Sequence, residues 1–298
     1  MGDSEAQKRG CGGDVPAQTR SYGRSLGRLS EFLKILRCPE TFAPLEAVWP
    51  DRMVTVGRSR SWPIVQGVPN LYSGLVDPLE HGEHLSHPIC PEAQALIDSA
   101  DGLVLNLSAG GSLRKDPKVV ELEAGIFRHT DLLADAHNLP FVDGAFAAVL
   151  ALNAFEHYRD PVTVAREIAR VLRPGGRVFI HTAFLQPLHE SPRHFYNATR
   201  FGILEWFSDF QTETLRVSDN FNPVHTVAWI AAETERMLIS GLPPEAANKL
   251  LDTSLREYAR MWRDPSLRRG PVWESFLRIP AAQQEAIAAG FEYVGKRL

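Results

Sequence analysis

The sequence contains little cysteine and no long hydrophobic run. Its 298 residues include three cysteines, too few and too scattered for a disulfide framework or an all-cysteine zinc site: Cys11, Cys38 and Cys90. Their odd number favours a reducing compartment. No apolar stretch approaches the roughly 18 residues that a membrane-spanning helix needs. The N-terminus lacks the apolar core of a signal peptide, and Ala6 stands where the myristoylation pattern requires Ser or Thr. We therefore expect a soluble, cytoplasmic protein with no membrane partner.

An excess of charge of either sign is also absent. The chain carries 32 Lys and Arg residues against 36 Asp and Glu, which gives a net charge of −4 and a pI of about 6.2. Because nucleic-acid binding calls for a basic surface that neutralises phosphates, we expect no nucleic-acid partner. The hydrophobic share of 44% and the charged share of 23% are typical of a globular protein and exclude a mainly disordered chain. The sequence favours no particular oligomeric state.

Composition divides the chain into four parts. Residues 1–30 are rich in Gly and poor in apolar side chains, which predicts a disordered tail. In residues 31–75, short apolar runs broken by Gly and Pro predict a small module of strands and tight turns. Residues 76–215 form the predicted core, entered through a linker that ends in a helix over Pro91–Ser99. Residues 216–298 predict a helical extension, with helical periodicity over 226–239, 244–262 and 280–297.

The core has the pattern of a parallel sheet. A buried strand at Gly102–Leu107 runs into a turn of small residues, Ser108–Ser112, where backbone can approach a ligand closely. The turn lacks the G-x-G-x-x-G spacing of a dinucleotide site, which disfavours a nicotinamide dehydrogenase. No G-x-S-x-G motif indicates a hydrolase. Four further strands are expected at Lys118–Glu123, from Asp131, at Ala147–Leu152 and at Arg177–His181.

A helix and a tight turn connect the last two of these strands. Asp160 caps the helix, Pro161 occupies its first turn, and Pro174-Gly175-Gly176 end it, so that the chain makes the crossover of a parallel sheet. The first two crossovers are only about ten and seven residues long, whereas a parallel connection normally needs about a dozen or more. We therefore predict that their helices are clipped to a turn or so. The fold class is α/β, a compact Rossmann-like parallel sheet.

Four segments in this order and spacing resemble class I S-adenosylmethionine-dependent methyltransferases. They are Val104–Gly111, Asp135–Phe141, Glu156-His157 and Val171–Gly176, and the resemblance spans about residues 102–210. It implies a methyltransferase core with S-adenosylmethionine as cofactor. The ligand of such a fold lies at the carboxyl ends of the strands.

The resemblance also implies which residues bind the cofactor. The turn from Ser108 would face the methionine part, Glu123 would hold the ribose, and Asp135 with the Ala136 backbone would meet the adenine. Asn153 would line the sulfonium and acceptor side. The full implied set is Asn106, Ser108, Ala109, Gly110, Gly111, Glu123, Asp135, Ala136 and Asn153.

The small module resembles a different family. Cys38-Pro39-Glu40-Thr41 and the Pro-Ile-x-x-Gly-Val-Pro sequence at 63–69 are similar to the zinc-ribbon-like module of tRNA methyltransferase activator proteins. A zinc ribbon needs four ligands and this segment offers Cys38 alone, so we expect a metal-free packing module. The linker histidines His81, His84 and His87 could in principle bind a metal on a helical face, but helix-breaking neighbours favour solvated side chains.

The segment after the fifth strand, residues 182–200, lies over the reactive methyl in this family. Methyl transfer needs mainly alignment, and an alcohol acceptor gains from a base of near-neutral pKa. His189 is the first candidate for that base and His194 the second. The alternative is that these residues only fix the loop, and His157 is expected to be structural.

We therefore predict a methyltransferase acting on a small-molecule acceptor, by O-methylation of a sugar or secondary metabolite. The alternative is a catalytically degenerate methyltransferase-fold protein that binds or scaffolds. Asn106 stands where the family usually has Asp or Glu, Ser108 where it has Gly, and both support this alternative together with the clipped crossovers.

Overall fold

The small module is an antiparallel sheet preceded by a helix. The computed structural model describes residues 26–74, 78–81, 84–86, 89–284 and 287–289, so most of the predicted tail, Cys11 and His87 lie outside the described residues. The sheet has the strand order β1-β2-β3-β4, and its bounds are Leu45–Val48, Arg52–Thr55, Ser61–Val65 and Val68–Pro69. The tail prediction is wrong for residues 26–30, which belong to helix α1 (Leu26–Phe32). Leu29 and Phe32 share one face of that helix and are 5% and 1% exposed, so their burial orders the segment.

This module shares its hydrophobic core with the rest of the protein. Cys38 is a free cysteine and is fully buried, packed in the same apolar cluster as Trp62 of β3 and Leu105 of the central sheet. The short 3₁₀ helix η1 (Leu33–Ile35) leads into this region, and the Arg37 amide donates to the Pro140 carbonyl of the core at 2.8 Å. The module is therefore a packed side of the core rather than a separate unit.

The core is a five-stranded parallel sheet, which confirms the α/β prediction. Its order is β7-β6-β5-β8-β9, with bounds Leu132–Leu133, Val119–Glu123, Val104–Leu107, Phe146–Leu152 and Leu172–His181. Strand β9 is longer than predicted, because Leu172 pairs with Phe146 before the Pro-Gly-Gly turn bulges and Arg177 resumes pairing with Ala148. The chain progresses to one side from β5 and to the other side from β8. The carboxyl ends of these two strands form the switch point where ligands of open α/β sheets bind.

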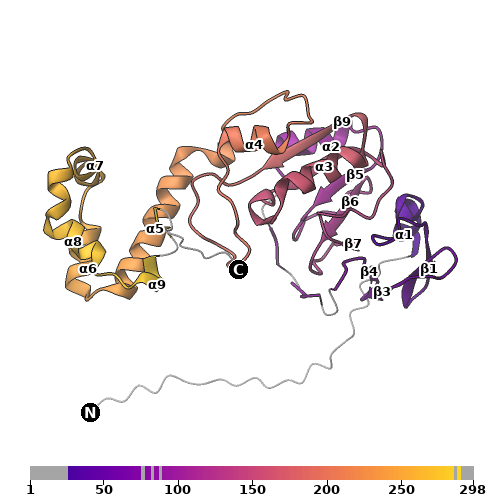
Figure 1. Ribbon diagram of the computed structural model, residues 1–298, viewed down its shortest axis with the longest axis horizontal. Coiled ribbons are helices and arrows are strands. Elements are labelled where there is room, and N and C mark those ends of the chain that lie inside the picture. Colours follow the sequence, from indigo (N-terminus) through magenta and orange to yellow (C-terminus); the bar gives the residue numbers. More distant parts are fainter. Residues whose placement is uncertain (1–25, 75–77, 82–83, 87–88, 285–286, 290–298) are drawn as a thin grey trace, which may run out of the picture.

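Both faces of the sheet are covered (Figure 1). Side chains alternate along each strand, so Val104 packs beneath α2 (Pro91–Ser99) while Leu105 faces α3 (Pro161–Val171) and the small module. Helix α2 has the predicted bounds. Helix α3 begins as predicted, with Asp160 Oδ1 accepting the Thr163 amide at 3.0 Å.

The first two crossovers contain no helix among the described residues, so the prediction of clipped connections is confirmed. A buried ion network takes the place of packed helices in the β5–β6 connection. The Lys115 ammonium pairs with Asp131 and lies 3.9 Å from Glu121 Oε1, and these carboxylates are 7% and 2% exposed. The Asp131 carboxylate also accepts the Glu121 amide at 2.9 Å, which ties the connection to β6.

The C-terminal extension is helical and builds a small core of its own. Its elements follow α4 (Arg200–Trp206) and are η3 (Asp219–Phe221), α5 (Pro223–Gly241), α6 (Pro244–Leu251), α7 (Leu255–Arg263), η4 (Pro265–Arg269), α8 (Pro271–Leu277) and α9 (Ala281–Gln284). Figure 1 shows α5 leading from the sheet to the remaining helices, whose core includes Leu238, Leu250 and Ile279. None of the described helices is long and apolar enough to cross a membrane.

One helix prediction in this extension is wrong, and another lies mostly outside the described residues. The helix expected over 244–262 is broken, because Ser254 and Glu257 form a capping box that starts α7. The helix expected over 280–297 begins as α9, and most of its remaining residues lie outside the described part of the chain. Helix α8 was not expected from the sequence. Pro271 at the start of α8 marks this helix in the sequence.

Candidate functional site

The turn after β5 has the conformation that a glycine-rich turn would take. Ser108 has φ +52° and Gly110 has φ +62°, the left-handed region that disfavours a side chain. Ser108 tolerates it while its Oγ shares a 2.8 Å hydrogen bond with the Tyr158 hydroxyl, and burial raises the pKa of Tyr158, which keeps that phenol neutral. The Ala109 amide donates to the Leu122 carbonyl at 3.3 Å. Hydrogen bonds thus fix the turn to Tyr158 on one side and to β6 on the other, at the switch point.

Glu123 ends β6 and reaches back to this turn. Its Oε1 accepts the Gly110 amide at 2.6 Å, and its Oε2 accepts the Ala124 amide at 3.0 Å. Burial raises the pKa of the Glu123 carboxyl, and the nearby Glu190 carboxylate adds to the rise against the lowering effect of these two amides. The structure therefore brings together the implied ribose ligand and the implied methionine turn.

A segment of the linker covers the same turn, and sequence reasoning missed it. Ser86 Oγ accepts the Gly111 amide at 3.0 Å, and the Ser86 amide donates to the Gly111 carbonyl at 2.9 Å. A Cβ on Gly111 would lie 1.9 Å from the His84 carbonyl oxygen. The glycines therefore permit close backbone packing. Nothing in the local pattern of residues 84–86 signals this contact, because its cause is tertiary.

The adenine end of the implied site is built around Asp135. Asp135 Oδ1 accepts His137 Nδ1 at 2.7 Å and the His137 amide at 2.9 Å, and the hydrogen bond from the imidazole is the main cause of the lowered pKa of Asp135. His137 Nε2 accepts the Asp160 amide at 3.2 Å, which fixes the tautomer. Ala136, the residue between them in the chain, is buried.

Two implied ligands lie on β5 and directly after β8. Asn153 follows β8 with φ +51°, and its Oδ1 is buried with no hydrogen-bond partner among the described residues. Asn106 is 3% exposed inside β5, so it is part of the sheet interior. Asn153 thus offers a hydrogen-bond acceptor at the switch point, whereas the Asn106 side chain lies inside the sheet.

The loop after β9 brings its two candidate bases together. The His189 and His194 rings lie 4.1 Å apart, and the His189 ring also lies 5.3 Å from Trp229 of α5. His194 Nδ1 accepts the His189 amide at 3.2 Å and its Nε2 donates to the Tyr196 carbonyl at 3.1 Å. Burial lowers the pKa of His194, which keeps it neutral near pH 7. His189 Nδ1 donates to the Pro187 carbonyl at 2.9 Å, which leaves Nε2 available.

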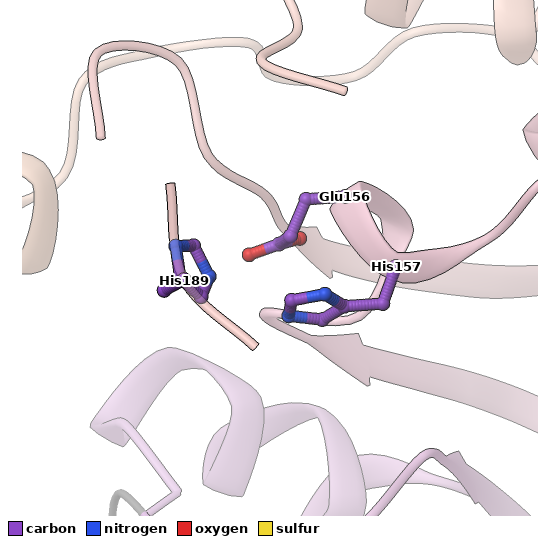
Figure 2. Close-up of side chains that lie close together, drawn as sticks. All are labelled: Glu156, His157 and His189. Atoms are coloured by element: carbon purple, nitrogen blue, oxygen red, sulfur yellow. The ribbon is translucent and has the colours of Figure 1, made fainter. Parts of the chain in front are cut away.

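His189 faces two residues of the 3₁₀ helix η2 (Phe155–His157), as Figure 2 shows. Glu156 is fully buried, and burial raises the pKa of its carboxyl. Ligand atoms of Glu156, His157 and His189 all lie within 4.8 Å of one another. Sequence reasoning treated His157 as structural and gave Glu156 no role. The signal was an acidic residue and a histidine immediately after a buried strand.

Comparison with known proteins supports the methyltransferase resemblance of the core. A family model described as a methyltransferase domain matches residues 114–180, which span β6 to β8 and most of β9. The 27-O-demethylrifamycin SV methyltransferase of Amycolatopsis mediterranei is 46% identical over 160 residues, 53% of this chain and 50% of that protein. The demethylmenaquinone methyltransferase of Mycolicibacterium paratuberculosis is 37% identical over 93 residues, 29% of this chain and 40% of that protein.

Among solved structures, the YcgJ protein of Bacillus subtilis is similar with a TM-score of 0.33 and 19% identity, covering 52% of this chain and 86% of that one. The chain spans half or less of the length of the two curated relatives. The similarity to each of them therefore covers only part of both proteins.

Proposed function

We propose that this protein is an S-adenosylmethionine-dependent methyltransferase that O-methylates a small molecule, a sugar or a secondary metabolite. The observation that carries the proposal is the convergence of implied cofactor ligands at one edge of the sheet. The turn at Ser108–Gly111, Glu123, Asp135 and Asn153 each follow or end a strand at its carboxyl end. The family match over residues 114–180 and the methyltransferase names of the relatives support the same reaction class.

The residues present fit the cofactor. Each Glu123 oxygen accepts one backbone amide, so each keeps a lone pair for a ribose hydroxyl. The Asp135 side chain is 40% exposed and both His137 bonds use its Oδ1, which leaves Oδ2 for the adenine edge. Asn153 Oδ1, which has no hydrogen-bond partner among the described residues, would face the sulfonium. Bound S-adenosylmethionine would supply the methyl group, which is activated because it is attached to a positively charged sulfur that is a good leaving group.

His189 is the general base for the acceptor. Its Nε2 would take the proton of an acceptor hydroxyl when that oxygen receives the methyl group. Phe184 and Leu185 on the same loop are 50% and 55% exposed, and Trp229 packs against the His189 ring. These apolar surfaces favour a hydroxyl on an apolar body. The relative named for 27-O-demethylrifamycin SV supports an oxygen acceptor.

One observation favours the second candidate, a degenerate protein that binds or scaffolds without chemistry. Ser86 and the His84 carbonyl pack directly on Gly110 and Gly111, the backbone that the cofactor would approach. In an active enzyme this segment forms one wall of the cofactor site. In a degenerate protein it closes the site.

Transfer of a labelled methyl group from S-adenosylmethionine to a panel of sugars and metabolite alcohols tests the function. We expect turnover of at least one alcohol, a rate lowered about 100-fold or more by His189→Ala, and no change for the exposed control His225→Ala. Absence of transfer to every alcohol, with cofactor binding intact, would favour the binding protein. An unchanged rate in His189→Ala would refute the role of His189.

A further inference from the structure

Glu156, His157 and His189 form a compact set of metal-ligating side chains. The first two come from η2, directly after β8, and the third from the loop after β9. Figure 2 shows the Glu156 carboxylate directed into the space between the two imidazole rings. One ligand atom from each residue lies within 4.8 Å of the others. Two imidazoles and one carboxylate are the donor set of a common class of catalytic zinc site.

The hydrogen bonds of both imidazoles orient them as metal ligands. His157 Nδ1 donates to the Arg193 carbonyl at 3.1 Å, and His189 Nδ1 donates to the Pro187 carbonyl at 2.9 Å. A carbonyl only accepts, so both rings carry their proton on Nδ1 when neutral and keep an Nε2 lone pair. A metal-bound histidine usually donates the proton of its other ring nitrogen to a carbonyl or carboxylate in this way. His194 differs, because both of its nitrogens are already engaged.

Glu156 supplies the independent observation. The residue is 0% exposed, its Oε2 accepts the Thr182 hydroxyl at 3.0 Å, and its Oε1 has no hydrogen-bond partner among the described residues. A buried carboxylate oxygen without a partner is costly, and a cation in the space that it faces would satisfy it.

We propose that these three residues bind a divalent first-row transition-metal ion of the Zn²⁺ type, with a fourth position open to an acceptor oxygen. Ligands about 2.1 Å from a tetrahedral ion lie roughly 3.4 Å apart, so the ion draws the three atoms inward. His189 lies on a loop without regular structure, which permits this movement. Metal binding does not depend on the proposed methyl transfer.

The role of the ion does rest on the proposed function. The site begins three residues after Asn153, on the acceptor side of the switch point. A metal-bound hydroxyl loses its proton to solvent more readily, so the ion would prepare an acceptor oxygen for methylation. His189 then acts as a ligand of the ion, whereas without an ion it acts as the base.

Calorimetric titration of the full chain with ZnCl₂, in the absence of S-adenosylmethionine, tests the site. We expect one ion per chain and an affinity lowered about tenfold or more in Glu156→Gln and His189→Ala. The control His225→Ala removes an exposed histidine on α5 and should leave the affinity unchanged. Circular dichroism shows whether each variant is folded, and Glu156→Gln changes the shape of the side chain little.

A Co²⁺ titration separates this site from binding at the cysteines. We expect visible d–d bands of a four- or five-coordinate ion, lost in Glu156→Gln, and no sulfur-to-cobalt charge-transfer band. Absence of Zn²⁺ binding, equal binding by wild type and both variants, or a thiolate band that persists in Glu156→Gln would overturn the proposal. A failed methyl-transfer assay with intact Zn²⁺ binding would count against the proposed function alone.

Discussion

The Gly110 amide donates a 2.6 Å hydrogen bond to Glu123 Oε1, and this bond ties the turn after β5 to the end of β6. It joins the two places where a class I methyltransferase would hold its cofactor. Because the carboxylate is buried and lies near Glu190, its charged form is disfavoured, and the pKa of Glu123 is raised. The ionised Glu123 carboxylate that holds the turn therefore lowers the stability of the folded state.

This raised pKa predicts a pH dependence of stability. Between the ordinary value of 4.5 and the raised value, the folded state binds more protons than the unfolded state, so the unfolding free energy falls as pH rises through that window. Glu123→Gln lacks this titration. Urea unfolding of both proteins from pH 4 upward measures their free energies of unfolding. The value of wild type relative to Glu123→Gln should fall as pH rises. If the two free energies change with pH in parallel, the raised pKa of Glu123 is contradicted.

Lys115 is predicted to be essential for stability. Lys115→Met removes the ammonium that pairs with Asp131 and lies 3.9 Å from Glu121 Oε1, two carboxylates that are 7% and 2% exposed. Removing one partner of a buried ion network costs about 3–5 kcal/mol, and the Arg28 guanidinium, 3.5 Å from Asp131, offsets part of this cost. The exposed control Lys249→Met should change the unfolding free energy by less than about 0.5 kcal/mol. Similar values for the two variants in chemical denaturation would show that the network contributes little.

Gly111→Ala is predicted to displace the segment at residues 84–86. The added Cβ would meet the His84 carbonyl oxygen at 1.9 Å, so backbone must move, at a cost of about 1–3 kcal/mol. Hydrogen exchange should become faster at the Ser86 amide, which donates to Gly111 in the wild type. In the control Gly202→Ala, the new Cβ has its nearest neighbour at 3.7 Å. Unchanged exchange at Ser86 in Gly111→Ala would refute this packing.

Much of the fold follows from local pattern in the sequence. Apolar runs ended by small or acidic residues predict the five strands, and the Asp160 cap and Pro161 predict the start of α3. The short spacing between strands predicts the absence of full crossover helices. Interactions between residues close in the sequence determine these features, so they can be predicted from the sequence.

The features that the sequence did not reveal depend on contacts between distant residues. Lys115 meets Asp131, Ser86 meets Gly111, and Glu156 meets His189 only after the chain has folded. The burial of Leu29 in α1 likewise depends on the core that it joins. Glu123 could be found because it ends a strand, and Glu156-His157 could be seen to follow one, whereas nothing in the sequence brings His189 to them.

Calorimetric titration with S-adenosylmethionine and S-adenosylhomocysteine tests the central claim most directly. The account predicts saturable binding of both, weakened about 10-fold or more by Glu123→Ala through the loss of hydrogen bonds to a charged group, and unchanged by the exposed control Glu205→Ala. No detectable binding at millimolar cofactor by the folded wild-type chain would contradict it and leave the degenerate binding protein as the better account.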